Sequence, residues 1–482
     1  MKTLKNIKYI GLFALAIGFT SCNDESDFEE FLDMPPEDAV ILPALTAGSA
    51  DFSNYISLGA SFTSGYTDGA LFMAAQDNSF PNTLSKQFAN ANGGAFTQPL
   101  MNDNIGGLVF GTTVLANPRL FFNGSGPQVL PATPTTDVTN SLAADGSIFK
   151  NVGVPGAKST HIDFNGYAGL NPYFGRFANS PTVSMLEYAI AQNPTFFTLS
   201  EIGGNDVLGY ATTGGDGTDP ITPSATFDFV FNDMVNQLTA VCPNGVVTNV
   251  PYITDLPHFT TVPHNPVPLD AATATALNQG YATYNGGLQF AMTNGLLTQS
   301  EVDQRTITFA ASETNAMVLV DETLTDLTGF GIPSYRQATA EDLFVLPLST
   351  LIPQGYGTQI PLEDKWALLP SEQLEIKTAT DGYNATIASV ASTKGLALVN
   401  LNVILSEASS TGVTFDTYNL TTDLVTGGLV SLDGIHLTAR GYALMANKFL
   451  EAIDATYGSN FVASGNVSIA DDFGVTYSPT LQ

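Results

Sequence analysis

Short runs of apolar and β-branched residues recur along the chain from about residue 52 and alternate with longer segments of helical periodicity. Five runs are predicted to be β-strands, namely Asn54–Leu58, Ile148–Val154, Thr195–Ser200, Gly245–Val250 and Ala397–Leu401. Strands that alternate with helices indicate βαβ units, which build parallel sheets. The pattern therefore predicts an α/β fold with a central parallel sheet of about five strands.

Helical periodicity is strongest near the C-terminus. Apolar side chains recur there at three- and four-residue steps, at Tyr442, Met445, Ala446, Phe449, Ile453 and Tyr457. This spacing predicts a helix that packs by one face, with Thr438 as N-cap and Gly458 as terminator. A second packed helix is expected over Tyr383–Thr393. The Gly- and Asn-rich stretches 92–107 and 211–220 are predicted to be long loops.

The composition is that of a folded and strongly acidic protein. Of the 482 residues, 44% are apolar and only 12% are charged, which favours a packed globule over a disordered chain. The length predicts either two domains or one domain with large insertions. The net charge of −30 repels phosphate backbones and anionic headgroups, which disfavours nucleic acid as a partner and excludes polybasic adhesion to membranes.

The N-terminus has the pattern of an export signal. Lys2, Lys5 and Lys8 precede an apolar run over residues 9–19 that is too short to span a bilayer and ends in small residues before Cys22. The segment Phe19-Thr-Ser-Cys22 resembles a bacterial lipobox, which implies a lipidated Cys22 after removal of residues 1–21. An ordinary secretion signal with an incidental cysteine is the alternative. The other cysteine, Cys242, is isolated, so no disulfide framework is expected.

The segment after Cys22 is acidic. Eight Asp and Glu residues and no basic residue occupy positions 23–38, which predicts a solvated tether over residues 22–50. An acidic run after a lipidated cysteine resembles the surface-export signals of lipoproteins of Bacteroidota, and Asn23 fits sorting to the outer membrane. These resemblances imply an outer-membrane lipoprotein of the cell envelope, held by its lipid anchor and facing the surface or the periplasm.

Two short segments carry candidate catalytic residues. Ser61 follows the apolar run that ends at Leu58, so it is expected at the carboxyl edge of a strand, where open α/β sheets bind ligands. In Asp433-Gly-Ile-His436 the three-residue spacing lets the carboxylate accept a hydrogen bond from one imidazole nitrogen and leaves the other nitrogen free to take a proton from a serine. A helix-capping Asp beside a surface His is the structural alternative.

Two Gly-rich segments could supply charge stabilisation. Gly156 could present a backbone N–H that no side chain obstructs, and Asn205, in Ile202-Gly-Gly-Asn-Asp206, could offer its side-chain amide. Together with the N–H of Ser61 they would form an oxyanion hole, a device in which each donor contributes about 2.7–4 kcal/mol to catalysis. Each segment alone is more often a plain turn.

The ordered set of these segments resembles the four sequence blocks of SGNH (GDSL-like) hydrolases. The blocks are Gly59-Ala-Ser-Phe62, the segment that ends at Gly156, Gly203-Gly-Asn-Asp206 and Asp433-x-x-His436. The resemblance implies a three-layer, flavodoxin-like α/β/α sandwich, a catalytic set of Ser61, Asp433 and His436, oxyanion donors from Ser61, Gly156 and Asn205, and no cofactor. The chain departs from the family at Ala60, which replaces the acid beside the nucleophile, and at Phe62, which replaces Leu.

The expected function is therefore a serine ester hydrolase that acts on lipid or other acyl esters at the bacterial envelope. A carbohydrate O-acetylesterase and a non-catalytic lipoprotein that binds glycans or partners are the alternatives. The hydrolase domain is expected over 51–460, with insertions mainly within 207–395, followed by a C-terminal tail over 461–482. Apolar residues of the insertion favour acyl substrates, although they are equally ordinary for a core: Phe330, Phe344, Leu346, Leu348, Leu351 and Ile352.

Other candidate sites are weaker. The chain has no G-x-S-x-G, H-E-x-x-H, C-x-x-C or P-loop motif. His258 and His264 could be a metal pair but are expected in an ordered loop at the rim of the active site, and His161 is expected to satisfy a local backbone group. Asp216 and Asp219 could hold calcium, but their stretch lacks the spacing of an EF-hand loop.

Overall fold

Five parallel strands form the central sheet in the computed structural model, which describes residues 42–482. The strands are β1 (Tyr55–Gly59), β6 (Asn151–Gly153), β7 (Phe196–Ser200), β8 (Gly245–Thr248) and β13 (Ala397–Val399). Every residue of β1, β7 and β8 is buried, as expected for parallel strands covered on both faces. All five predicted strands are thus confirmed, and the α/β fold with them. Residues 1–41, which include Cys22, lie outside the described residues.

The strand order β13-β8-β7-β1-β6 makes β1 the neighbour of both β6 and β7. Numbered along the chain, the order is 2-1-3-4-5, which is that of flavodoxin-like folds. The register pairs Gly59 with Gly153 on one side and with Ser200 on the other. The three strands therefore end at the same level, and the loops that follow them meet at one edge of the sheet.

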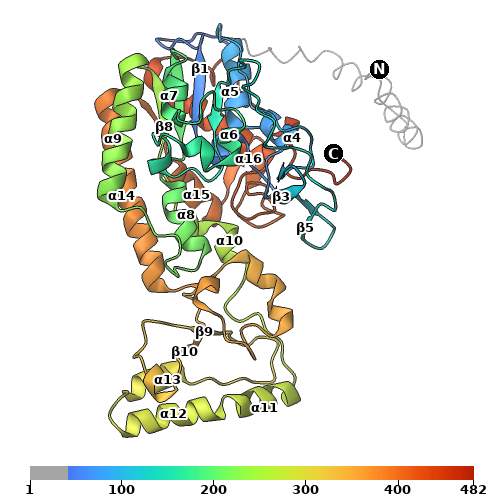
Figure 1. Cartoon of the computed structure of the whole chain (residues 1–482), viewed down its shortest axis with the longest axis vertical. Helices are drawn as coiled ribbons and strands as arrows, with labels where there is room; N and C mark the ends of the chain where they lie inside the picture. Colours follow the sequence, from blue (N-terminus) through green and yellow to red (C-terminus); the bar gives the residue numbers. More distant parts are fainter. Residues whose placement is uncertain (1–41) are drawn as a thin grey trace, which may run out of the picture. The chain divides into compact units, whose positions relative to one another are not determined.

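Helices cover both faces of the sheet, which gives the predicted three-layer sandwich (Figure 1). One face carries α7 (Met185–Ile190), α9 (Ser224–Val241) and α14 (Pro370–Lys394), and the other carries α5 (Phe80–Ala89) and α16 (Ala439–Tyr457). The helix predicted over 383–393 is the second half of α14. In α16 the Thr438 hydroxyl accepts the N–H of Gly441, and Gly458 adopts a φ of 70°, so both predicted caps are confirmed.

A lobe with its own hydrophobic clusters is inserted between β8 and α14, over residues 262–369. It contains α11 (Ala271–Gly280), α12 (Ala282–Thr293), α13 (Gln299–Arg305) and the antiparallel pairs β9–β10 (Val318–Val320, Tyr335–Gln337) and β11–β12 (Leu343–Phe344, Ala367–Leu368). Inside the lobe, the buried Arg336 guanidinium donates to both carboxylate oxygens of Asp342 at 2.7 Å. Within the 207–395 stretch, α9, β8 and α14 belong to the sandwich.

The remaining segments are short elements and loops around the sandwich. They include α3 (Ser61–Ser64), α4 (Met73–Asp77), α6 (Pro172–Gly175), α8 (Gly204–Thr212), α10 (Pro257–Thr260), α15 (Leu401–Ser410) and the hairpins β2–β3 (Leu108–Phe110, Thr113–Ala116), β4–β5 (Leu120–Phe122, Pro127–Val129) and β14–β15 (Val413–Phe415, Tyr418–Leu420).

Residues 461–482 pack against this body. Phe461 is fully buried, and the buried Arg119 donates to the carbonyl oxygens of Ser478 and Leu481 at 2.7 and 2.9 Å. The C-terminal segment is thereby tied to the loop that carries β4.

Candidate active site

Ser61 is the first residue of α3, two positions after the end of β1. It lies beside β7, at the point where the strand order reverses, which is where open α/β sheets bind ligands. The turn is tight because a Cβ on Gly59 would lie 2.6 Å from the carbonyl oxygen of Ser200 and would also overlap the Thr63 hydroxyl. The side chain of Ser61 is largely buried but lines a cavity.

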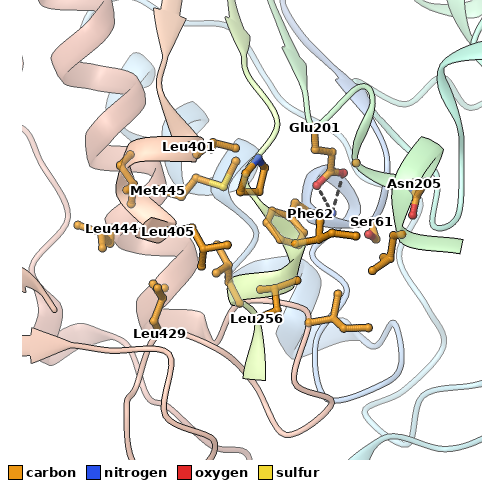
Figure 2. A pocket seen from close by; sticks show the side chains of 18 residues that line it. Ser61, Phe62, Glu201, Asn205, Leu256, Leu401, Leu405, Leu429, Leu444 and Met445 are labelled. Carbon is orange, nitrogen blue, oxygen red and sulfur yellow. Dashed lines mark hydrogen bonds between the residues drawn. The ribbon is translucent and has the colours of Figure 1, made fainter. Parts of the chain in front are cut away.

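Glu201, which follows β7, holds the first turn of α3. Its carboxylate accepts the N–H of Phe62 at 2.8 and 2.9 Å (Figure 2). It also accepts the N–H of Thr63 at 3.2 Å. Its backbone has a φ of 56°, a left-handed conformation that is uncommon for a residue other than glycine. Burial raises the pKa of Glu201 to about 8, although the N–H groups of Thr63 and Phe62 oppose the rise.

Asp433 and His436 form the hydrogen-bonded pair that their spacing predicts. The imidazole Nδ1 of His436 lies 2.8 Å from Oδ2 of Asp433. The other carboxylate oxygen, Oδ1, accepts the N–H groups of Ile435 and His436 at 2.9 Å. Burial raises the pKa of Asp433, but the imidazole and these N–H groups more than offset that effect, so its pKa lies well below the ordinary value. The carboxylate therefore stays ionised and fixes the imidazole.

The His436 ring packs against the segment that carries Ser61. Its centroid lies 4.6 Å from the ring of Tyr66 and 5.8 Å from that of Phe62. Gly69, which follows Tyr66 on the same segment, donates its N–H to Asp433 Oδ2 at 2.8 Å. No hydrogen bond joins the hydroxyl of Ser61 to the imidazole within residues 42–482, and catalytic bonds of this kind often tighten only when substrate binds.

The two remaining candidates, Asn205 and Gly156, are connected through one hydrogen bond to Ala157. Asn205, at the start of α8, donates from Nδ2 to the carbonyl oxygen of Ala157 at 2.9 Å, and its second N–H has no acceptor within residues 42–482. Gly156, next to Ala157, has a φ of 78° and open space around its Cα. Asn205 lines the same cavity as Ser61, whereas Gly156 is not part of the cavity lining.

Asp206, on α8, binds the loop that follows β6. Its carboxylate is fully buried and accepts both the N–H and the hydroxyl of Ser159, at 2.8 and 2.6 Å. The loop after β6 and the start of α8 are thereby held together. Asp206 is part of the recognised sequence block, but its bond to Ser159 was not predicted.

The cavity at Ser61 is apolar and has a volume of about 90 Å³. Ser61, Asn205 and Glu201 lie at one end, and aliphatic side chains from α15, α16 and the connecting loops fill the other (Figure 2). The aliphatic lining consists of Leu208, Ile253, Leu256, Leu401, Ile404, Leu405, Leu429, Ile435, Leu437, Leu444 and Met445.

The apolar residues that the sequence offered for substrate binding lie elsewhere. Phe344 and Leu348 belong to the core of the lobe, and Phe330 is exposed. The cavity lining comes instead from elements that surround Ser61 in space but lie up to almost 400 residues away in sequence. An apolar cavity is therefore present beside Ser61, but its wall is formed by residues other than those that sequence analysis named.

The remaining histidines have local structural contacts. His161 Nδ1 accepts the N–H of Lys158 at 3.1 Å, so the prediction of a backbone contact is confirmed. His258, on α10, is buried, and burial lowers the pKa of its imidazole. The backbone N–H of His258 donates to the carbonyl oxygen of Gly434 at 3.0 Å, which places α10 directly against the Asp433–His436 loop. In residues 42–482, His258 and His264 do not form a metal-binding group.

The two aspartates considered for calcium do not converge. Asp219 forms an ion pair with Lys158, and Asp216 accepts the N–H and hydroxyl of Thr218. These bonds explain the acidic stretch as a structured loop.

Comparisons with known proteins give no family assignment. No protein-family model matches the chain, and no curated protein sequence matches it significantly. Within the part of the chain that the structure describes, no helix combines the length and apolarity needed to cross a membrane.

Proposed function

We propose that the protein is a serine ester hydrolase of the SGNH type, with Ser61 as nucleophile, His436 as general base and Asp433 as the residue that orients the imidazole. The 2.8 Å contact between Asp433 and His436 beside the Ser61 segment carries this proposal. It gives the imidazole a fixed tautomer with a lone pair at Nε2, which is what a serine needs to lose its proton.

The reaction proceeds through an acyl-enzyme. Ser61 Oγ attacks the ester carbonyl carbon while Nε2 of His436 takes the hydroxyl proton. The N–H groups of Ser61 and Gly156 and the amide of Asn205 stabilise the oxyanion. The imidazolium then protonates the leaving alcohol, and the C–O bond breaks. A water molecule then gives a proton to His436 and attacks the acyl carbonyl carbon. The bond to Ser61 Oγ breaks, Oγ takes the proton back from the imidazolium, and the carboxylic acid is released. The reaction needs no cofactor.

The apolar cavity supports acyl esters as substrates. Each buried methylene group contributes about 0.8 kcal/mol, so each added carbon is expected to raise kcat/KM by roughly fourfold until the cavity is full. An acetyl group would leave most of the aliphatic lining without a contact, which disfavours the alternative of a carbohydrate O-acetylesterase. The second alternative is a non-catalytic lipoprotein that binds glycans or partners, and it offers no reason for the Asp433–His436 pair.

We further propose that the enzyme acts at the bacterial envelope, held at the outer membrane through lipid on Cys22. This part of the proposal rests on the sequence of residues 1–38. Metabolic labelling with an alkyne fatty acid should modify the native chain and fail to modify a Cys22→Ala variant. Equal labelling of both proteins would contradict it.

A chain-length series tests the function. Native protein and Ser61→Ala are compared on p-nitrophenyl acetate, butyrate and hexanoate and on acetylated xylan. We expect kcat/KM to rise along the ester series and the Ser61→Ala variant to keep less than a few per cent of the activity. Preference for acetylated xylan would favour the O-acetylesterase, and no turnover of any substrate would favour the binding protein.

A further inference from the structure

Three carboxylates meet where the inserted lobe joins the sandwich. Glu322 follows β9 of the lobe, Asp364 begins a 3₁₀ turn over Asp364–Trp366, and Glu372 lies in the first turn of α14. One oxygen from each lies within 4.8 Å of the others. Because α14 continues along the sheet beside α9, this cluster connects the lobe to the body of the protein (Figure 1).

The negative charge of the cluster is not balanced by protein groups. None of the ion pairs within residues 42–482 includes any of its three carboxylates. Lys365, the nearest basic residue in sequence, pairs with Glu363 instead. Like charges at this separation repel strongly and are stable together only when protonated or bridged by a cation.

Glu372 provides a second and independent observation. Its side chain is 4% exposed, and its Oε2 accepts the N–H of Leu369 at 2.6 Å. Its other oxygen, Oε1, is buried and accepts no N–H or hydroxyl group of residues 42–482. The loop at Gly215 closes over it, since a Cβ at that position would lie 2.5 Å from Oε1. A buried carboxylate oxygen without a donor is costly unless a proton or a cation neutralises the group.

We propose that Glu322, Asp364 and Glu372 bind a calcium ion that fixes the lobe to the sandwich. The ligands are all carboxylates, which favours a hard cation over zinc or copper. Calcium–oxygen distances of about 2.3–2.6 Å allow oxygens on opposite sides of the ion to lie up to about 5 Å apart, which the observed separations satisfy. Calcium also tolerates irregular coordination, whereas magnesium requires a near-octahedral set at shorter distances.

Terbium luminescence tests this site directly, because terbium replaces calcium and is excited by a nearby tryptophan. Trp366, the single tryptophan of the chain, lies in the same 3₁₀ turn as Asp364. Full-length protein treated with chelator and then titrated with Tb³⁺ should give saturable emission on tryptophan excitation. Added Ca²⁺ should displace the probe at concentrations at least tenfold below those needed for Mg²⁺.

Three variants decide the outcome. Glu372→Gln and the more exposed Glu322→Gln should each weaken terbium binding at least tenfold, and Ca²⁺ should no longer raise their Tm. Glu363→Gln is the matched control, since it makes the same change beside Asp364 but outside the cluster, and it should bind as the native protein does. Absence of saturable emission, or unchanged binding in folded Glu322→Gln, would overturn the proposal. Equal displacement by Mg²⁺ would overturn the choice of ion.

Discussion

Replacing Asp433 by asparagine should reverse the tautomer of His436. The carboxylate uses its two oxygens unequally: Oδ1 accepts three donors, from Ser431, Ile435 and His436, whereas Oδ2 accepts the Gly69 N–H and faces the imidazole. An asparagine NH₂ at the Oδ1 position would oppose three donors. At the Oδ2 position it would oppose only one backbone N–H, so the amide should settle with its NH₂ towards the imidazole.

That orientation forces the imidazole to accept at Nδ1 and to carry its proton at Nε2, where it can no longer take the proton of Ser61. For a triad with the wrong tautomer, kcat falls by about 10⁴-fold, which corresponds to roughly 5 kcal/mol. The lost bond from Gly69 to a charged acceptor should also lower the free energy of unfolding by about 1.5–3 kcal/mol. The variant should therefore be folded, less stable and almost inactive.

The assay is kcat and kcat/KM on p-nitrophenyl butyrate, with urea denaturation of the same preparations. Asp423→Asn serves as the control because it makes the same substitution at an exposed position ten residues earlier. The reasoning is refuted if Asp433→Asn stays folded and retains kcat within tenfold of the native value, or if Asp423→Asn loses as much.

Two further predictions concern the walls of the site. Glu201 has a folded-state pKa of about 8 against an ordinary 4.5, so the native free energy of unfolding should decline by up to about 5 kcal/mol as the pH rises from 4.5 to 8. Denaturation at pH 5 and pH 8 should show that the free energy of unfolding of Glu201→Gln lacks this decline. An equal decline in the variant and in the native protein would contradict Glu201 as its source. Leu405→Trp should fill the cavity and, by excluding about two methylene groups, lower kcat/KM for the hexanoate roughly 15-fold relative to the acetate. The exposed Leu374→Trp on α14 is its control, and an unchanged chain-length profile in Leu405→Trp would argue against acyl binding in this cavity.

The sheet could be predicted from the sequence because buried parallel strands are continuous apolar runs, and such runs are visible without knowledge of their partners. The caps of α16 were predicted for the same reason, since Thr438 and Gly458 act within one turn of the helix. The pair Asp433–His436 was also local, because three residues span one turn.

The features that sequence analysis missed depend on contacts between distant segments. Glu201 appears in the sequence as an acidic residue after a strand, and only the register of β1 with β7 brings it to the amides of Phe62 and Thr63. Leu256 and Leu405 lie almost 150 residues apart yet line one cavity, whereas Phe344, which has the same apolar character, fills the core of the lobe. Apolarity predicts burial but not the partner.

Covalent labelling of the nucleophile tests the central proposal most directly. Native protein is treated with a fluorophosphonate, which forms a stable bond only with an activated serine, and the modified peptide is identified by mass spectrometry. We expect one equivalent of label on Ser61, parallel loss of esterase activity, and no label in Ser61→Ala or on other serines. Label on a different serine, or none on a folded and active protein, would contradict Ser61 as the nucleophile.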